Sequence, residues 1–226
     1  MRNVLFAAIL ATVFGTGLMA TDVPEKFSDR VRSDFFNGFQ GDEEALARGL
    51  KICEETLAKN PKHAEAMVWR GAGRVFQSGQ QFQKKNMVEG MKLWTTGHKD
   101  LDEAVALAPD SIGVRIPRAA TLLPASRGAP PAMGKPLLTK ALDDFQTIYK
   151  KQEKELDKLG THPRGELRMG LADVYRALGE SDKSKEQLEA VIKEIPQSKY
   201  AARAKEWLAA PADAKLAHSC IGCHGK

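Results

Sequence analysis

The last nine residues of the chain, HSCIGCHGK, contain the side chains with the clearest chemistry. Within them, Cys220, Cys223 and His224 form the sequence Cys-x-x-Cys-His. Two thiols at this spacing can bond the two vinyl groups on one edge of a porphyrin, and the imidazole that follows then lies beneath the iron. The spacing therefore predicts covalent attachment of haem through Cys220 and Cys223, with His224 as a ligand of the iron.

This motif resembles the attachment site of c-type cytochromes, in which a glycine such as Gly225 often follows the histidine. The resemblance implies a covalent haem c, a redox partner and a role in electron transfer. The chain departs from the family because only Gly225 and Lys226 follow the motif, where a class I cytochrome c has several helices and a distal methionine. The haem pocket must then come from the rest of this chain, from a second chain or from solvent. An exposed haem would tend towards a low potential.

The second iron ligand and the use of the motif itself stay open. A bare disulfide between Cys220 and Cys223, an unused remnant and a truncated cytochrome are alternatives to haem, and a thioredoxin-like site is disfavoured because no βαβ pattern surrounds the motif. A zinc site would need four ligands inside one short loop, His218, Cys220, Cys223 and His224. The candidate distal ligands of a haem are His63, His98, His162, His218, Met133 and Met169, and His218 is awkwardly close to the attachment cysteines.

The N-terminal segment Met1–Ala20 has the three parts of a secretory signal peptide: a charged start, an apolar middle and a small-residue end. Its apolar run, Val4–Phe14, is short for a membrane span of about 20 residues, so cleavage after Ala20 is favoured over an uncleaved anchor. No cysteine follows that site directly, which disfavours a lipoprotein. The expected location is periplasmic or otherwise exported, with no membrane span after cleavage. Export agrees with the haem motif, because c-type cytochromes receive their haem outside the cytoplasm.

Charge and composition exclude other function classes. The net charge of +5 arises from basic and acidic residues that are interleaved, as in Lys150–Lys158, so nucleic acid is not an expected partner. No Ser/His/Asp set, phosphate loop or paired-carboxylate motif stands out, and the protein is not expected to be an enzyme.

The elements that must position the motif are helices. In Pro163–Pro196 the apolar residues fall at helical spacing in two runs, with Gly179 suited to the left-handed position between them and Ser181 to a helix cap. Neither apolar face can be buried by a lone hairpin, so the pair needs neighbouring pairs. A small residue, a larger apolar residue and a small or branched residue recur at fixed offsets before three closing prolines: Ser184, Leu188 and Val191; Gly97, Leu101 and Ala104; Gly49, Cys53 and Thr56.

With Ala172, Tyr175 and Gly179 also matching, the stretch from Phe27 to Leu208 resembles the tetratricopeptide repeat (TPR) family, although Arg168 replaces its frequent tryptophan. The resemblance implies an all-α solenoid of about four helical hairpins plus a capping helix over residues 21–209, followed by a flexible tail over residues 210–226. It also implies a protein or peptide partner on the concave face of the repeats.

Several local features carry narrower expectations. The phenylalanine-rich face that begins at Phe27 is expected to be core, and Cys53 a small buried thiol. The extra segment Gln77–Asn86, with Met87, Met91 and Trp94 nearby, could line a binding site, although core packing is favoured for these side chains.

Proline and glycine mark Pro124–Pro136 as the clearest loop, and Pro117 is expected to kink or reset the helix before it. Arg115, Arg118 and Arg127 lie near that loop and could hold an anionic partner, with a tolerated surface insertion as the alternative. A polar extension is expected before Pro163, and Tyr200–Leu208 is expected to form a closing helix.

Overall fold

The structure is a computed structural model that describes residues 26–211, 214 and 216. These residues form nine α-helices and one 3₁₀ helix and contain no strand, so the all-α prediction is confirmed. The elements are α1 Phe27–Phe39, α2 Glu43–Lys59, α3 Ala64–Gln83, α4 Met87–Leu107, α5 Ile112–Gly128, α6 Pro131–Gln152, η1 Glu153–Lys158, α7 Thr161–Ala177, α8 Ser181–Glu194 and α9 Lys199–Ala209.

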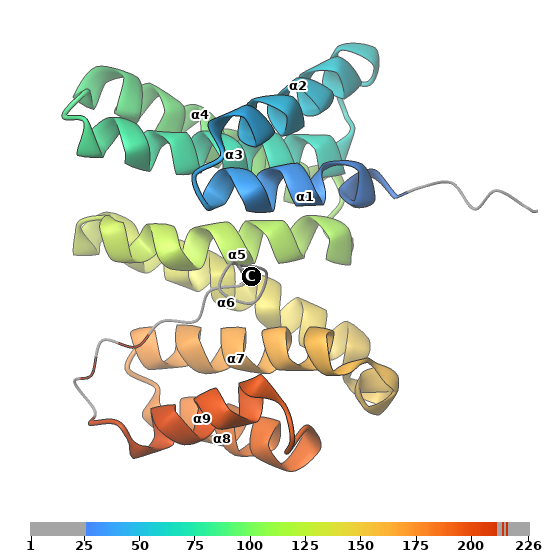
Figure 1. Cartoon of the computed structure of the whole chain (residues 1–226), viewed down its shortest axis with the longest axis vertical. Coiled ribbons are helices and arrows are strands. Elements are labelled where there is room, and N and C mark those ends of the chain that lie inside the picture. Colours follow the sequence, from blue (N-terminus) through green and yellow to red (C-terminus); the bar gives the residue numbers. More distant parts are fainter. Residues whose placement is uncertain (1–25, 212–213, 215, 217–226) are drawn as a thin grey trace, which may run out of the picture.

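Consecutive helices pair into four hairpins that stack in chain order, and α9 closes the stack on α8 and α7 (Figure 1). This is the TPR-like solenoid predicted from the sequence. Most buried apolar side chains form one cluster that runs from Phe27 to Tyr175. A second cluster lies between α7, α8 and α9 and includes Met169, Leu188 and Trp207. The last hairpin and the closing helix therefore have a small core of their own.

The hairpin α7–α8 confirms the prediction for Pro163–Pro196, with one correction. Gly179 has φ +80°, the left-handed conformation that glycine adopts without strain. Ser181 does not cap α8, because it is already the first helical residue and Glu180 holds the N-cap position.

The small residues at fixed offsets lie where the two helices of a hairpin approach each other. A Cβ atom added to Gly97 would lie 3.0 Å from the carbonyl oxygen of Gly71 on α3. At the matching position of the last hairpin, the Ser184 hydroxyl donates a hydrogen bond of 2.8 Å to the Ala172 carbonyl oxygen. A Cβ atom added to Gly49 would lie 2.9 Å from the Phe35 ring of α1, so at this position the close neighbour is a side chain and not backbone. The sequence pattern thus located close contacts between the two helices of three hairpins.

The predicted loop Pro124–Pro136 is wrong. The helix α5 continues past Pro117 and Pro124, and only two residues separate it from α6, which begins at Pro131. Each internal proline removes a helical hydrogen bond, but side chains of α5 such as Leu122 are buried against other helices, which offsets that cost. A proline in the first turn of α6 replaces an N–H group that has no helical partner anyway.

Of the other local predictions, some are confirmed and some are wrong. The phenylalanine-rich face is core, Trp207 of the closing helix is buried, and Cys53 is fully buried, which raises the pKa of its thiol to about 12. The polar extension is the 3₁₀ helix η1. Most of Gln77–Asn86 is the last part of α3 rather than an insertion outside the helices. Core packing is wrong for Met87 and Met91, which are 59% and 46% exposed.

Candidate functional site

The predicted haem-attachment residues Cys220, Cys223 and His224 lie outside the described residues, as does the predicted signal peptide Met1–Ala20. What the structure describes is the chain that leads to the motif. After α9, the carbonyl oxygen of Pro211 accepts a hydrogen bond of 2.9 Å from Arg176 Nη2 at the end of α7. Leu216 then packs against the cluster between α7, α8 and α9. The chain is therefore held on the last hairpin shortly before the motif begins.

Of the candidate distal ligands, His63 is committed to a structural role. Its Nδ1 accepts a hydrogen bond of 3.1 Å from the Ala66 backbone N–H and so caps α3. A neutral His63 must then carry its proton on Nε2, the atom that faces away from the cap. His63 borders a hollow of about 390 Å³ beside Phe27 and Ser111, but this tautomer has no lone pair to offer a metal there.

His98 is also unsuitable, because its ring lies between α4 and its neighbours. The His98 ring contacts the Trp94 ring at 4.3 Å between centroids, and its Nε2 is shielded from solvent without a hydrogen-bond partner among the described residues. Burial lowers the pKa of His98 to about 4, while the charge of Asp102 acts to raise it and that of Lys140 to lower it further. The imidazole is therefore neutral at physiological pH.

This burial makes the stability of the fold depend on pH. The unfolded chain binds a proton at His98 with a pKa near 6.5 and the folded chain only near 4, so unfolding takes up a proton between these values and the free energy of unfolding falls as the pH drops through them. A shift of this size corresponds to about 3 kcal/mol, and partial exposure of the ring reduces the expected loss to about 2 kcal/mol. Urea unfolding at pH 7, 5 and 4 measures this loss of stability.

The control is the variant His98→Gln, whose free energy of unfolding should fall by about 2 kcal/mol less than that of the native chain between pH 7 and 4. Equal losses in both proteins would contradict the assignment of the pH dependence to His98.

The two methionine candidates differ in exposure. Met169 is fully buried in the cluster between α7, α8 and α9, so its sulfur can reach a cofactor only if that cluster opens. Met133, in the first turn of α6, is 40% exposed. Its thioether is accessible, but no polar group of the described residues is shown to orient it. The sixth candidate, His218, lies outside the described residues.

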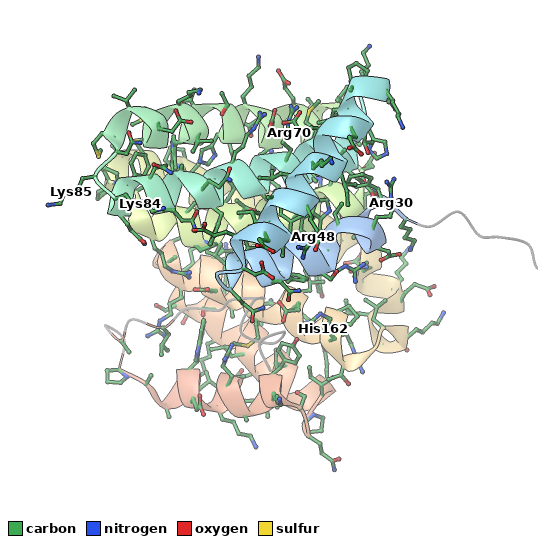
Figure 2. The ribbon with its side chains drawn as sticks, turned by 45° about the horizontal axis from the view of Figure 1, so that its top comes forward. Arg30, Arg48, Arg70, Lys84, Lys85 and His162 are labelled. Carbon is green, nitrogen blue, oxygen red and sulfur yellow. The ribbon has the colours of Figure 1, made fainter. Side chains whose placement is uncertain are left out.

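His162 is held by a chain of hydrogen bonds. The Tyr200 hydroxyl donates to Glu166 Oε1 at 2.7 Å, and His162 Nδ1 lies 2.7 Å from the same hydroxyl oxygen. A tyrosine hydroxyl has a single hydrogen, so Nδ1 must donate to it and a neutral His162 carries its lone pair on Nε2. The His162 side chain is 53% exposed, whereas the Glu166 side chain is only 15% exposed. His162 lies in the α7–α9 part of the stack, remote from the hairpin that carries Lys84 and Lys85 (Figure 2).

The arginines predicted to hold an anionic partner are occupied within the chain. Arg115 and Arg118 both donate to the carboxylate of Asp144, which is fully buried in α6. Burial raises the pKa of Asp144, and the two arginines act against that shift. Arg127 contacts the buried Asp173 of α7. These arginines stabilise contacts between helices, and that role replaces the predicted anion site.

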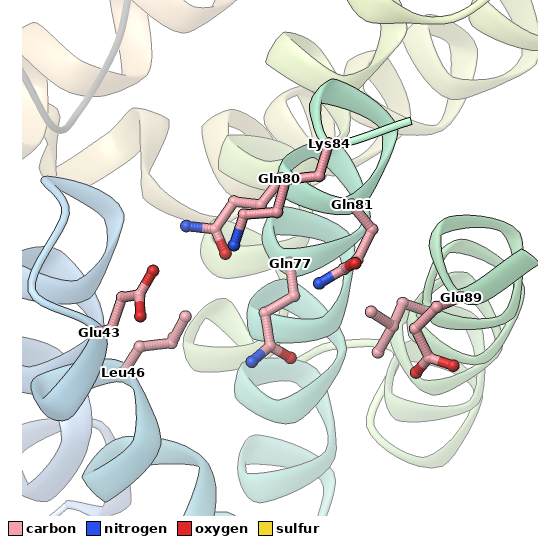
Figure 3. A pocket seen from close by; sticks show the side chains of 8 residues that line it. Glu43, Leu46, Gln77, Gln80, Gln81, Lys84 and Glu89 are labelled. Atoms are coloured by element: carbon pink, nitrogen blue, oxygen red, sulfur yellow. The ribbon is translucent and has the colours of Figure 1, made fainter. Parts of the chain in front are cut away.

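A polar hollow of about 370 Å³ opens between α2, α3 and α4 (Figure 3). Three glutamines of α3 line this hollow, Gln77, Gln80 and Gln81. Their side-chain amides offer both hydrogen-bond donors and acceptors, the two groups that an extended peptide main chain needs. The hollow lies between α3, the first helix of its hairpin, and α2 and α4, the second helices of theirs. Its lining residues are Glu43, Leu46, Gln77, Gln80, Gln81, Lys84, Glu89 and Leu93.

Next to this hollow, the first turns of α4 expose three apolar side chains, Met87, Val88 and Met91, which we call the α4 patch. Val88 is the most exposed of them, at 83%. Contiguous apolar side chains on a surface are typical of sites that bind other proteins, and methionine adapts to differently shaped partners. Sequence periodicity pointed to these methionines but assigned them to the core.

No group of three or more histidine, cysteine, aspartate or glutamate side chains within residues 26–211, 214 and 216 is arranged to hold a metal ion. None of the helices in this part of the chain combines the length and the apolar character that crossing a membrane requires.

Comparison with known proteins gives little more. No family model and no curated protein matches the sequence. Among solved structures, the chain is similar to a thermophilic TPR protein of Thermus thermophilus, with a TM-score of 0.38 and 18% identity over 81% of this chain and 99% of that one.

Proposed function

We propose that this protein is an exported helical-repeat protein that carries a covalent haem c on its C-terminal tail and docks to protein partners in electron transfer. The observation that supports the haem most directly is the Cys-x-x-Cys-His sequence of Cys220, Cys223 and His224. The leader-like segment Met1–Ala20 agrees with it, because the two signals are independent and both imply export.

Two contacts after α9 support this proposal. The Pro211 carbonyl oxygen accepts a hydrogen bond from Arg176, and Leu216 packs against the cluster between α7, α8 and α9, so these two described residues before the motif contact the last hairpin. The stacked hairpins then offer the docking surface, as helical-repeat arrays do for protein partners. His224 would be the protein ligand of the iron, and the chemistry that a bound haem would supply is reversible one-electron transfer.

The test is expression of the full chain in a host with a cytochrome c maturation system, followed by a haemochrome spectrum and the mass of the intact protein. We expect one haem per chain, lost in Cys220→Ser/Cys223→Ser. The control Cys53→Ala should keep it, because Cys53 is fully buried in α2 and its raised thiol pKa makes it unreactive. Native protein without covalent haem would refute the proposal.

The second candidate function is an interaction scaffold without haem, in which Cys220 and Cys223 form a disulfide or bind zinc. The exposed α4 patch favours this candidate, because it is a docking feature that needs no cofactor. Free-thiol counting and zinc analysis of the exported protein separate the two forms of this alternative from each other and from haem.

The α4 patch gives a prediction that either function shares. If Met87, Val88 and Met91 are a contact surface rather than core, replacing all three by glutamine should change the free energy of unfolding by no more than about 1 kcal/mol. The control Leu101→Ala, on the buried face of the same helix, should cost about 2–5 kcal/mol. Thermal unfolding followed by circular dichroism measures both, and a large loss in the triple variant would return these side chains to the core.

A further inference from the structure

We propose that the hollow between α2, α3 and α4 is a docking site for an arginine side chain of a partner protein, whose guanidinium group would lie between Glu43 and Glu89. The site belongs entirely to the first two hairpins, so it does not depend on the haem. The protein's own arginines show how a guanidinium group fills a groove of this kind.

Arginines of first helices bridge acidic residues of consecutive second helices at two places in the stack. Arg70 of α3 donates to Asp100 of α4 at 2.8 and 2.9 Å and to Glu54 of α2 at 3.1 Å. Arg74, one turn further along α3, contacts the same two carboxylates at 2.9 Å. Arg118 of α5 likewise contacts acidic residues of α4 and α6. A guanidinium group between two acidic walls is therefore how this fold joins its second helices.

The hollow repeats the two acidic walls of the first bridge without its arginines. Glu43 lies on α2 eleven residues before Glu54, which is about three turns along the same face. Glu89 lies on α4 eleven residues before Asp100, again about three turns. Figure 3 shows Gln77 of α3 between these two walls. A neutral amide thus occupies the face of α3 that carries guanidinium groups about two turns earlier.

Several polar groups of the hollow have hydrogen-bonding capacity to spare. The side chains of Glu43, Gln77 and Gln80 form no hydrogen bond or ion pair with any residue that the structure describes. Within the same part of the chain, the Glu89 carboxylate pairs only with the exposed Lys92, at 3.3 Å. Carboxylate and amide oxygens are acceptors, and a guanidinium group offers five N–H donors in one plane. The unused acceptors therefore suit an arginine.

The remaining lining residues agree with this partner. Leu46 and Leu93 provide apolar surface on which the methylene groups of an arginine can pack. The lining carries two carboxylates and one ammonium group, that of Lys84, so its charge favours a cation. Lys84 has no hydrogen bond or ion pair with a described residue and acts against a cationic ligand by charge repulsion.

The test is a titration of the full chain, labelled with ¹⁵N, with N-acetylarginine methylamide, followed through the side-chain NH₂ signals of the three glutamines. We expect saturable shifts of these signals, and none with the citrulline analogue, which has the same shape without the charge. Glu43→Gln/Glu89→Gln should weaken binding at least about tenfold. The matched control is Glu44→Gln, in the same turn of α2 but outside the hollow, and it should leave the dissociation constant unchanged.

Two further variants test the sign of the charge effect. Gln77→Arg should keep the helical circular dichroism signal but lose binding of the arginine probe, because its own guanidinium group fills the hollow. Lys84→Gln should strengthen binding about two- to threefold, because it removes the like charge. Equal shifts with the arginine and citrulline probes, or unchanged binding in Glu43→Gln/Glu89→Gln, overturn the proposal. So do shifts produced only by N-acetylglutamate methylamide, which indicate a site for acidic side chains. None of these results depends on haem content, so the haem proposal is tested separately.

Discussion

Replacing Asp144 by alanine should lower the free energy of unfolding by about 3–5 kcal/mol, the largest effect we expect from a single side chain. The Asp144 carboxylate is fully buried and accepts a two-pronged contact from Arg118, with Nε and Nη2 at 2.7 and 2.9 Å. It also accepts from Arg115 Nη1 at 2.7 Å. Removing it leaves two guanidinium groups, on side chains 10% and 7% exposed, without their central acceptor.

Asp143 is the matched control for this experiment. It is the preceding residue of α6 and contacts the same Arg115 Nη1 at 2.8 Å, but its side chain is 62% exposed. Asp143→Asn should therefore cost less than about 1 kcal/mol, as exposed ion pairs do. Urea unfolding of both variants, followed by far-ultraviolet circular dichroism, gives the comparison. Equal losses at the two positions would mean that burial does not control the strength of this network.

The Asp144 network belongs to a feature that recurs along the stack. In three hairpins, an arginine of the first helix reaches an acidic residue of the second: Arg70 to Asp100, Arg118 to Asp144 and Arg168 to Glu194. A buried ion pair contributes little net stability when it is compared with apolar residues of the same volume. If the two helices of a hairpin were aligned differently, however, these charges would be buried without partners, which is costly. We infer that the pairs help to fix how the two helices of each hairpin are aligned.

Part of this feature was visible in the sequence. The last two pairs are each separated by 26 residues, which is a signal for one contact repeated in successive hairpins. Sequence reasoning instead offered an external anion for Arg115 and Arg118, with a tolerated surface insertion as the alternative, because both arginines lie near the predicted loop. The acceptor lies on the next helix, and only the antiparallel hairpin brings it near.

The hydrophobic period and the turn glycine, by contrast, are local signals, and they predicted the hairpins well. Gly179 at φ +80° and the buried face of α7 followed from residues within a few positions of each other. The loop prediction at Pro124–Pro136 was wrong because it also used only local signals. Proline and glycine content is also local, while the burial that keeps α5 helical through Pro124 comes from other helices.

The surroundings of His162 also combine signals that are local in the sequence with contacts that only the fold creates. His162 stood among six candidates because any histidine or methionine can bind iron, and Glu166, one helical turn away, was visible as a possible partner. Tyr200 is 38 residues from His162, and no spacing in the sequence connects the two. The tautomer that distinguishes His162 from His63 is therefore a property of the folded chain alone.

The small residue at each hairpin crossing leads to the second large prediction. Gly97→Leu should lower the free energy of unfolding by about 3 kcal/mol, because any side chain at this position meets backbone atoms that cannot move aside without separating α3 from α4. The first atom of the new side chain would lie 3.0 Å from both the Gly71 carbonyl oxygen and the Val75 backbone nitrogen. Leucine is a good helix former, so the loss cannot be attributed to helix propensity.

Gly79→Leu provides the control, since Gly79 also lies inside a long helix of the same hairpin but has open space around its Cα. There the helix propensity of leucine should act alone and raise the free energy of unfolding by about 0.5–1 kcal/mol. The two identical substitutions are thus expected to act in opposite directions, and urea unfolding of both variants tests this directly. If Gly97→Leu were neutral or stabilising, the recurrence of Gly49, Gly97 and Ser184 would not reflect close helix contact, and the reason given for the repeat would fail.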